Sequence, residues 1–282
     1  MKLYKIKTGA LLQQLDSFYY LQQPWNELIN RNNLHDYLQQ QASPVSAIST
    51  EKAEACLHHE LMAPIGQQEV WAAGVTYLRS KSARMDESKE SGAADLYNKV
   101  YDAVRPELFF KALPHRVAGH KDTVNIRKDS TWNVPEPELT LFINSWGIIE
   151  AYTIGNDMSS RSIEGENALY LPQAKIYERS AGIGPCLYVP GVPLPIETTI
   201  SMKIIRNGQQ MYHDSTSVSR IKRTLPELAD WLYQEMDFPF GSFLMTGTCL
   251  VPSNDFTLAE GDVIEITIDG IGTLTNYTAI KK

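Results

Sequence analysis

The sequence predicts an α+β protein that is mainly β, and three observations carry this prediction. Short runs rich in β-branched and aromatic residues recur along most of the chain, and Gly, Pro and Asn-Gly pairs separate them. Helical periodicity is confined to a few stretches. The composition, with 43% hydrophobic and 21% charged residues, is that of a globular protein. With 282 residues, the chain is long enough to bury a core that needs no disulfides or structural metal.

Residues 1–65 are expected to form a small N-terminal α/β domain. The run MKLYKIKTG alternates as a short strand does, and the run DSFYYLQ is a candidate pairing partner for it. Trp25, Leu28 and Ile29 follow at helical spacing, which continues to Leu38. A Gln-rich connection then leads to the second domain.

Residues 66–282 are expected to form the second, larger domain. The run EVWAAGVTYL predicts a buried strand, and the polar segment after it favours a helix. Thr224 at an N-cap position, Pro226 close behind it and Glu227 three residues after the cap predict a helix in TLPELADWLYQEM. The other strand-like runs are ELFFKAL, LTLFINS, IEAYTIGND, PCLYVPG, TTISMKIIRNG, DVIEITIDG and GTLTNYTAI.

Charge and cysteine content narrow the possible partners. The formal net charge of −7 and the sequence pI of about 5.4 argue against nucleic acid or anionic membrane as partners, but not against a small anionic substrate. Three scattered cysteines without a CxxC pair favour a reducing compartment. No signal peptide and no apolar run of ~20 residues is evident. We therefore expect a cytoplasmic protein without a membrane partner.

Three acidic residues are the strongest chemical signal. Glu136 and Glu138 are two residues apart in VPEPELTLFI, so strand alternation places them on one face. Asp157 ends another strand-like run, and a hairpin would bring it beside the pair. Carboxylates that converge raise one another's pKa, and a divalent cation removes this conflict. Magnesium is expected, with manganese or calcium as alternatives, since all three favour hard oxygen ligands. On spacing alone, an exposed strand face and a turn residue explain these acids as well.

Several segments together resemble the fumarylacetoacetate hydrolase superfamily over about residues 69–276. The matching segments are ELFFKAL, PEPELTLFI, IGNDMSSRSIEGEN, QAKIYERSAGIGP, MTGTCLVP and LAEGDVIEITIDGIGTLTN. The resemblance implies a rolled mixed β-sandwich, a homodimer, and a magnesium ion held by Glu136, Glu138 and Asp157. It also implies a small anionic 2-oxo acid that chelates the metal.

The run SSRSIEGENALYLPQAK is closest to the branch of that family that acts on sugar acids. Hydrolases of the family usually carry glutamine at the position of Glu164 and a histidine at the position of Ser80. Such a histidine activates water for attack on a carbonyl carbon. Its absence favours dehydration of a 2-keto-3-deoxy sugar acid by enolate formation and loss of water. A C–C hydrolase or decarboxylase of a small oxo acid is the alternative, and a non-catalytic sugar-acid binding protein is a second.

The resemblance also implies roles for further residues. Glu164 and Lys175 match family site positions and are the expected acid–base groups, in preference to Glu166. Lys175 fits equally well as a residue that orients a metal-bound carboxylate. Thr248 matches a position near the substrate carboxylate, and a tight turn also explains it.

Basic residues are candidates for binding the anionic substrate. Arg79 and Arg84 lie where the family has a lid over the site, although a solvated helix face has the same composition. Lys111 in FFKAL is expected near the site, but packing at the rim of the core explains it nearly as well. Arg161 is expected to pair with a structural carboxylate rather than with substrate.

Overall fold

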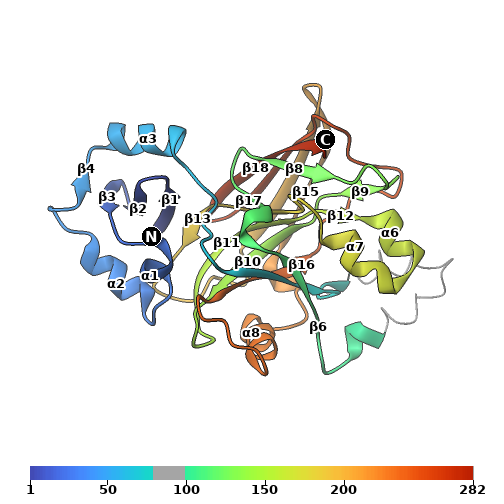
Figure 1. Ribbon diagram of the computed structural model, residues 1–282, viewed down its shortest axis with the longest axis horizontal. Coiled ribbons are helices and arrows are strands. Elements are labelled where there is room, and N and C mark those ends of the chain that lie inside the picture. The colour runs from blue at the N-terminus through green and yellow to red at the C-terminus, as the bar shows by residue number, and fades with distance from the viewer. Residues whose placement is uncertain (79–98, 282) are drawn as a thin grey trace.

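A computed structural model describes residues 1–78 and 99–281, in which two β-sheets pack face to face (Figure 1). The larger sheet of the described chain has 11 strands in the order β4-β3-β2-β1-β13-β11-β10-β16-β5-β6, with β7 paired beside β13. The smaller has five strands in the order β15-β14-β17-β18-β8. The mainly β fold predicted from the sequence is confirmed, and no described helix is long and apolar enough to cross a membrane.

The larger sheet contains β1 (Lys2–Ile6), β2 (Gly9–Gln14), β3 (Ser17–Leu21), β4 (Ala47–Ile48), β5 (Glu69–Gly74), β6 (Glu107–Ala112), β7 (Val117–Ala118), β10 (Pro137–Ile143), β11 (Ile149–Asp157), β13 (Ala181–Tyr188) and β16 (Ser242–Thr248). The smaller sheet contains β8 (Thr123–Ile126), β14 (Thr199–Arg206), β15 (Gln209–Ser217), β17 (Val263–Ile268) and β18 (Gly272–Ile280). A two-stranded ribbon joins β9 (Asn133–Val134) to β12 (Ser159–Ser160).

The described helices lie at the edges and ends of the sheets (Figure 1). They are α1 (Trp25–Ile29), α2 (Leu34–Gln41), α3 (Thr50–His59), α6 (Arg161–Glu166), α7 (Leu171–Lys175) and α8 (Leu225–Tyr233), with 3₁₀ turns η1 (Pro114–Arg116), η2 (Ala168–Tyr170) and η3 (Val218–Arg220). The predicted cap of α8 is present, since the side chain of Thr224 accepts a hydrogen bond from the N–H of Glu227.

The centre of the larger sheet is buried on both faces. On one face, Leu139, Leu141 and Ile154 pack in a core that includes aliphatic residues of the smaller sheet. On the other, Phe142 belongs to a core that contains Leu28 of the N-terminal residues. All seven residues of β10 are buried as a result. A charged side chain at the end of this strand is therefore removed from water unless it borders a cavity.

The N-terminal strands extend the larger sheet. β1 pairs antiparallel with β13, so these residues share a sheet with the rest of the chain. The expected pairing of DSFYYLQ with the first strand is wrong. The intervening residues form β2, which pairs with both β1 and β3, because tight turns join each consecutive pair into hairpins. The domain boundary at residue 65 stays a prediction.

Candidate metal centre

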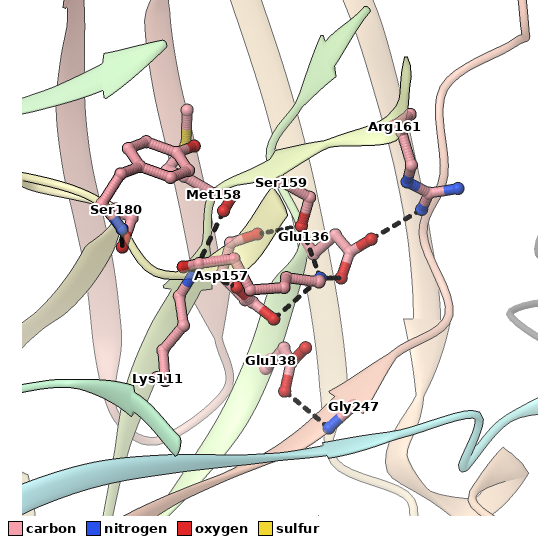
Figure 2. Close-up of polar contacts among 11 residues, drawn as sticks. Lys111, Glu136, Glu138, Asp157, Met158, Ser159, Arg161, Ser180 and Gly247 are labelled. Carbon is pink, nitrogen blue, oxygen red and sulfur yellow. Dashed lines mark hydrogen bonds and ion pairs between the residues drawn. The ribbon is translucent and has the colours of Figure 1, made fainter. Parts of the chain in front are cut away.

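The β10–β11 hairpin brings three carboxylates together. The strands are antiparallel, with Glu138 opposite Gly155, and the N–H of Asp157 donates to the carbonyl of Glu136 at 2.9 Å. Glu136, Glu138 and Asp157 are 4%, 2% and 1% exposed. One carboxylate oxygen from each lies within 4.8 Å of the others. Figure 2 shows the three side chains pointing toward one another from the strand ends.

Buried cations neutralise two of these carboxylates. Glu136 receives the Arg161 guanidinium at 2.6 Å on Oε1 and the Lys175 ammonium at 2.7 Å on Oε2. Asp157 receives Lys111 at 2.5 Å on Oδ1 and Lys175 at 2.9 Å on Oδ2. Burial opposes ionisation of Asp157, but the charges of Lys111 and Lys175 outweigh it and lower its pKa. Asp157 is therefore held as an anion.

Glu138 lies in a different environment. Among the described residues no lysine or arginine lies within ion-pair distance of it, and the backbone N–H of Gly247 donates to its Oε2 at 2.5 Å (Figure 2). Burial, followed by the charges of Asp157 and Glu136, raises the pKa of Glu138 well above its usual value. This carboxylate gains most from an added cation.

The residues present fit a hard divalent cation. Two oxygens on opposite sides of a magnesium ion are about 4.2 Å apart, since each Mg–O bond is about 2.1 Å long, and about 5 Å apart around calcium. The carboxylate oxygens of this cluster lie within 4.8 Å of one another, so small side-chain movements bring all three onto one ion. All three are oxygen donors, which magnesium and calcium prefer over nitrogen and sulfur.

Lys111 contacts the cluster through Asp157 and is fully buried. Besides its contact with Asp157, its ammonium donates to the carbonyl of Met158 at 2.9 Å and to that of Lys175 at 2.5 Å. Burial lowers its pKa to about 8, although the charge of Asp157 opposes this shift. Through these three contacts Lys111 ties β6, the end of β11 and α7 to one point.

Lys175 ends α7 and connects two of the carboxylates. In addition to Glu136 and Asp157, its ammonium donates to Oγ of Ser159 at 2.5 Å, and its side chain is fully buried. The contacts place Lys175 where it orients both carboxylates. Its role as an acid–base group stays a prediction.

Helix α6 separates the two glutamates of SIEGEN. Glu164 is 2% exposed, whereas Glu166 is exposed to solvent. Ser160 begins the helix, and its hydroxyl accepts a hydrogen bond from the N–H of Ile163. One helical turn thus buries Glu164 on the side that carries Arg161 and leaves Glu166 outside.

A narrow hollow of about 10 Å³ opens beside the carboxylates. Thr248, at the end of β16, lines it together with Phe109 and Gly74. The hydroxyl of Thr248 donates weakly, at 3.4 Å, to the carbonyl of Leu250. Arg79 and Arg84 lie outside the described residues, and so does Ser80.

Two residues near this hollow were not among the candidates from the sequence. Glu107 on β6 is opposite Gly74 on β5, and a Cβ on Gly74 would lie 2.0 Å from its Oε2. That oxygen is buried and has no hydrogen-bond partner among the described residues. Gly247 is the other, through its bond to Glu138. The expected pairing of Arg161 with a carboxylate is observed, and the carboxylate is Glu136 of the cluster itself.

Comparisons with known proteins agree with the fold and with this cluster. The profile of the fumarylacetoacetate (FAA) hydrolase C-terminal family matches residues 70–278. A Haloferax volcanii protein described as a "probable 2-keto-3-deoxyxylonate dehydratase" is 48% identical over 224 residues, which cover 79% of this chain and 76% of that protein. The 2-dehydro-3-deoxy-D-arabinonate dehydratase of Saccharolobus solfataricus is 42% identical over 224 residues, covering 78% and 74%.

A solved structure gives the same result in three dimensions. A 2-keto-3-deoxy-D-arabinonate dehydratase complexed with magnesium and 2,5-dioxopentanoate has a TM-score of 0.85 to this chain, with 31% sequence identity and all of both chains covered. The family match spans well over half of the described sequence and includes every member of the acidic cluster. The chain belongs to the fumarylacetoacetate hydrolase family.

Proposed function

We propose that this protein is a magnesium-dependent dehydratase of a 2-keto-3-deoxy sugar acid. The observation that carries the proposal is the buried convergence of Glu136, Glu138 and Asp157 in a chain whose relatives are dehydratases of such acids. The structural relative with magnesium and 2,5-dioxopentanoate suggests 2-keto-3-deoxy-D-arabinonate as a substrate. The sugar acid's length and stereochemistry are open to assay.

The reaction removes one water and moves hydrogen along the chain of the substrate. A proton leaves C3, next to the 2-oxo group, and the hydroxyl on C4 departs with a proton as water. Loss of a proton from C5 and protonation at C3 then give an enol. The proton of the C5 hydroxyl passes to C4 as the aldehyde forms, so the product is 2,5-dioxopentanoate, the compound bound in the structural relative. The protein must therefore accept a proton from C3 and supply one to the leaving hydroxyl.

Glu136, Glu138 and Asp157 are the proposed metal ligands. A divalent cation held there supplies Lewis-acid stabilisation of the negative charge that develops on the 2-oxo group when C3 loses its proton. Arg161 and Lys175 hold Glu136, and Lys111 and Lys175 hold Asp157, in fixed positions. These contacts support preorganisation of the ligands before substrate arrives.

The charges of the acidic cluster suit an anionic substrate. Three buried cations, Lys111, Lys175 and Arg161, lie against its three carboxylates. A divalent ion adds two positive charges to this cluster, and these attract the carboxylate of a 2-oxo acid.

We assign the acid–base chemistry to Glu164 and Lys175, and add Glu107 as a further candidate. Glu164 is buried on the same helix as Arg161, which supports its proximity to the cluster. Glu107 is supported by its buried Oε2 and by its place over Gly74, which lines the hollow. A buried carboxylate without a donor is costly unless a ligand completes it. Lys175 acts either on the departing hydroxyl or only on the carboxylates it contacts.

Substrate binding is assigned to Thr248, Arg79, Arg84 and Lys111. Thr248 lines the hollow, which supports contact with the substrate. The contacts of Lys111 with Asp157 and two carbonyls support a role in holding the metal ligands rather than in direct binding. The two arginines rest on the family resemblance alone.

A homodimer and a cytoplasmic location complete the proposal. The dimer follows from the family resemblance, and light scattering during size-exclusion chromatography measures it directly. The three cysteines are free thiols in the structure, which is compatible with a reducing compartment.

Proton exchange at C3 tests the function and the acid–base assignment together. Purified protein with Mg²⁺ and 2-keto-3-deoxypentonate in D₂O is followed by proton NMR, which reports loss of the C3 signals and formation of product. Glu164→Gln should slow both by about 10²–10⁴-fold. Glu166→Gln, on the exposed side of the same helix, is the matched control and should keep wild-type rates. Turnover of acylpyruvates but not of the sugar acid would contradict the proposed function.

A further inference from the structure

Strand β16 carries one extra residue where it passes the acidic end of β10. Glu138 is opposite Thr248 whereas Thr140 is opposite Met245, so two steps along β10 match three along β16. A β-bulge of this kind takes one backbone N–H out of the regular ladder. The freed donor is the N–H of Gly247, and it binds the side chain of Glu138 (Figure 2).

The bulge needs glycine at its centre and a small hydroxyl residue beside it. Gly247 has φ +98°, a conformation that L side chains rarely adopt. A Cβ there would also lie 1.9 Å from Oγ1 of Thr76. That hydroxyl donates to the carbonyl of Thr246 at 2.7 Å, and the carbonyl of Thr76 accepts from the N–H of Lys222 at 2.9 Å. Thr76 thus packs against the bulge through its side chain, and its own backbone is held by the bond from Lys222.

We propose that Thr76 and the bulge at residues 246–247 position Glu138 for the divalent cation. The inference rests on the proposed function, because it adds positioning residues to the metal site. Glu136 and Asp157 are held by charged side chains, which partly neutralise them. A backbone N–H holds Glu138 without adding a positive charge, so no lysine or arginine of the described residues competes with the ion for this carboxylate.

The test is the affinity of metal-free protein for Mn²⁺, measured by isothermal titration calorimetry. Thr76→Val has nearly the same shape but lacks the hydroxyl, so the carbonyl of Thr246 loses its donor. Affinity should fall by about tenfold, as is typical when a residue that orients a metal ligand is lost. Activity should recover as the metal concentration is raised to saturation. Thr76→Ser keeps the hydroxyl and should bind Mn²⁺ as the wild type does.

Thr153→Val is the matched control. Thr153 is a buried threonine of the same sheet whose hydroxyl also donates to a carbonyl, that of Gly184 at 3.3 Å. It should lower the melting temperature but leave Mn²⁺ affinity unchanged. If Thr76→Val does not fold, Thr76→Ala removes the same hydroxyl and carries the same expectation.

The outcomes separate the inference from the proposed function. Wild-type Mn²⁺ affinity in Thr76→Val or Thr76→Ala would overturn the positioning role while leaving the dehydratase intact. Activity that stays low at saturating metal would also overturn it, since it would mean damage to the fold. Absence of Mn²⁺ binding by the wild-type protein would remove the metal centre, and the inference would fall with it.

Discussion

The acidic cluster of the larger sheet and the Arg206–Asp262 pair of the smaller sheet both contain buried carboxylates, but only in the pair does every carboxylate have a cationic partner among the described residues. Asp262 is fully buried and receives two bonds from the guanidinium of Arg206, each at 2.7 Å, and one from the N–H of Ala259 at 2.9 Å. Every partner is a donor, and like charges do not meet. The pair can stabilise the fold without any ligand.

In the cluster, three carboxylates face one another. Lys111, Lys175 and Arg161 neutralise Glu136 and Asp157, while Glu138 retains a backbone donor and a raised pKa. Charge repulsion of this kind costs stability and is relieved by a cation. Burial and ion pairs are common to both regions and therefore do not identify a functional site. What distinguishes the cluster is the repulsion among its three carboxylates, which the described cations do not fully relieve.

The largest expected effect comes from changing one cluster acid and its counterpart in the pair. Asp157→Asn should lower dehydration activity by about a thousandfold or more, because the metal's stabilisation is worth several kcal/mol and each 1.4 kcal/mol is about tenfold in rate. Asp262→Asn removes the same charge from a site of similar burial and should keep activity in the folded protein. Rate assays with and without EDTA compare them. Equal losses in both variants would contradict the distinction.

Lys111→Met should give the next largest effect, on stability. Removing one partner of a buried ion pair costs about 3–5 kcal/mol, and here two carbonyls also lose a donor. An added divalent cation should restore part of this loss, since it replaces charge next to Asp157. Urea unfolding in EDTA and in Mg²⁺ measures the difference. If Mg²⁺ stabilises Lys111→Met no more than the wild type, Lys111 does not share its charge with the metal.

Arg206→Met should have a smaller effect and no metal dependence. The side chain of Arg206 is 29% exposed, so we expect a loss of about 2–3 kcal/mol in unfolding free energy, with activity retained. Lys203→Met is its control, because Lys203 and Glu265 are 3.6 Å apart and about 40% exposed, and such pairs contribute under about 1 kcal/mol. Rescue of Arg206→Met by Mg²⁺ would erase the contrast between the two regions.

The local sequence pattern was sufficient to predict the strands that carry the acidic cluster. Glu136, Glu138 and Asp157 could be placed together from the sequence, because strand alternation and a hairpin are short-range features. The helix capped by Thr224 and the turn at Asn207-Gly208, with φ of 51° and 79°, follow from local chemistry in the same way.

Other features depend on packing between distant segments. FFKAL contains no sign that Lys111 reaches Asp157, which is 46 residues away in sequence. The bulge at Gly247 exists only in register against β10, and Glu107 meets Gly74 only because β5 and β6 pair. The sequence did not predict β2, because polar and apolar residues do not alternate in GALLQQ. Which of its side chains are buried depends on packing after it pairs with β1 and β3.

The most direct test of the account is the anomalous diffraction of Mn²⁺ in crystals of this protein. We expect one strong peak bound by a carboxylate oxygen from each of Glu136, Glu138 and Asp157, with Lys111 and Lys175 still in contact with the carboxylates. A peak elsewhere, or no peak at saturating Mn²⁺ with the carboxylates as they stand, would contradict the claim that this cluster is a metal centre.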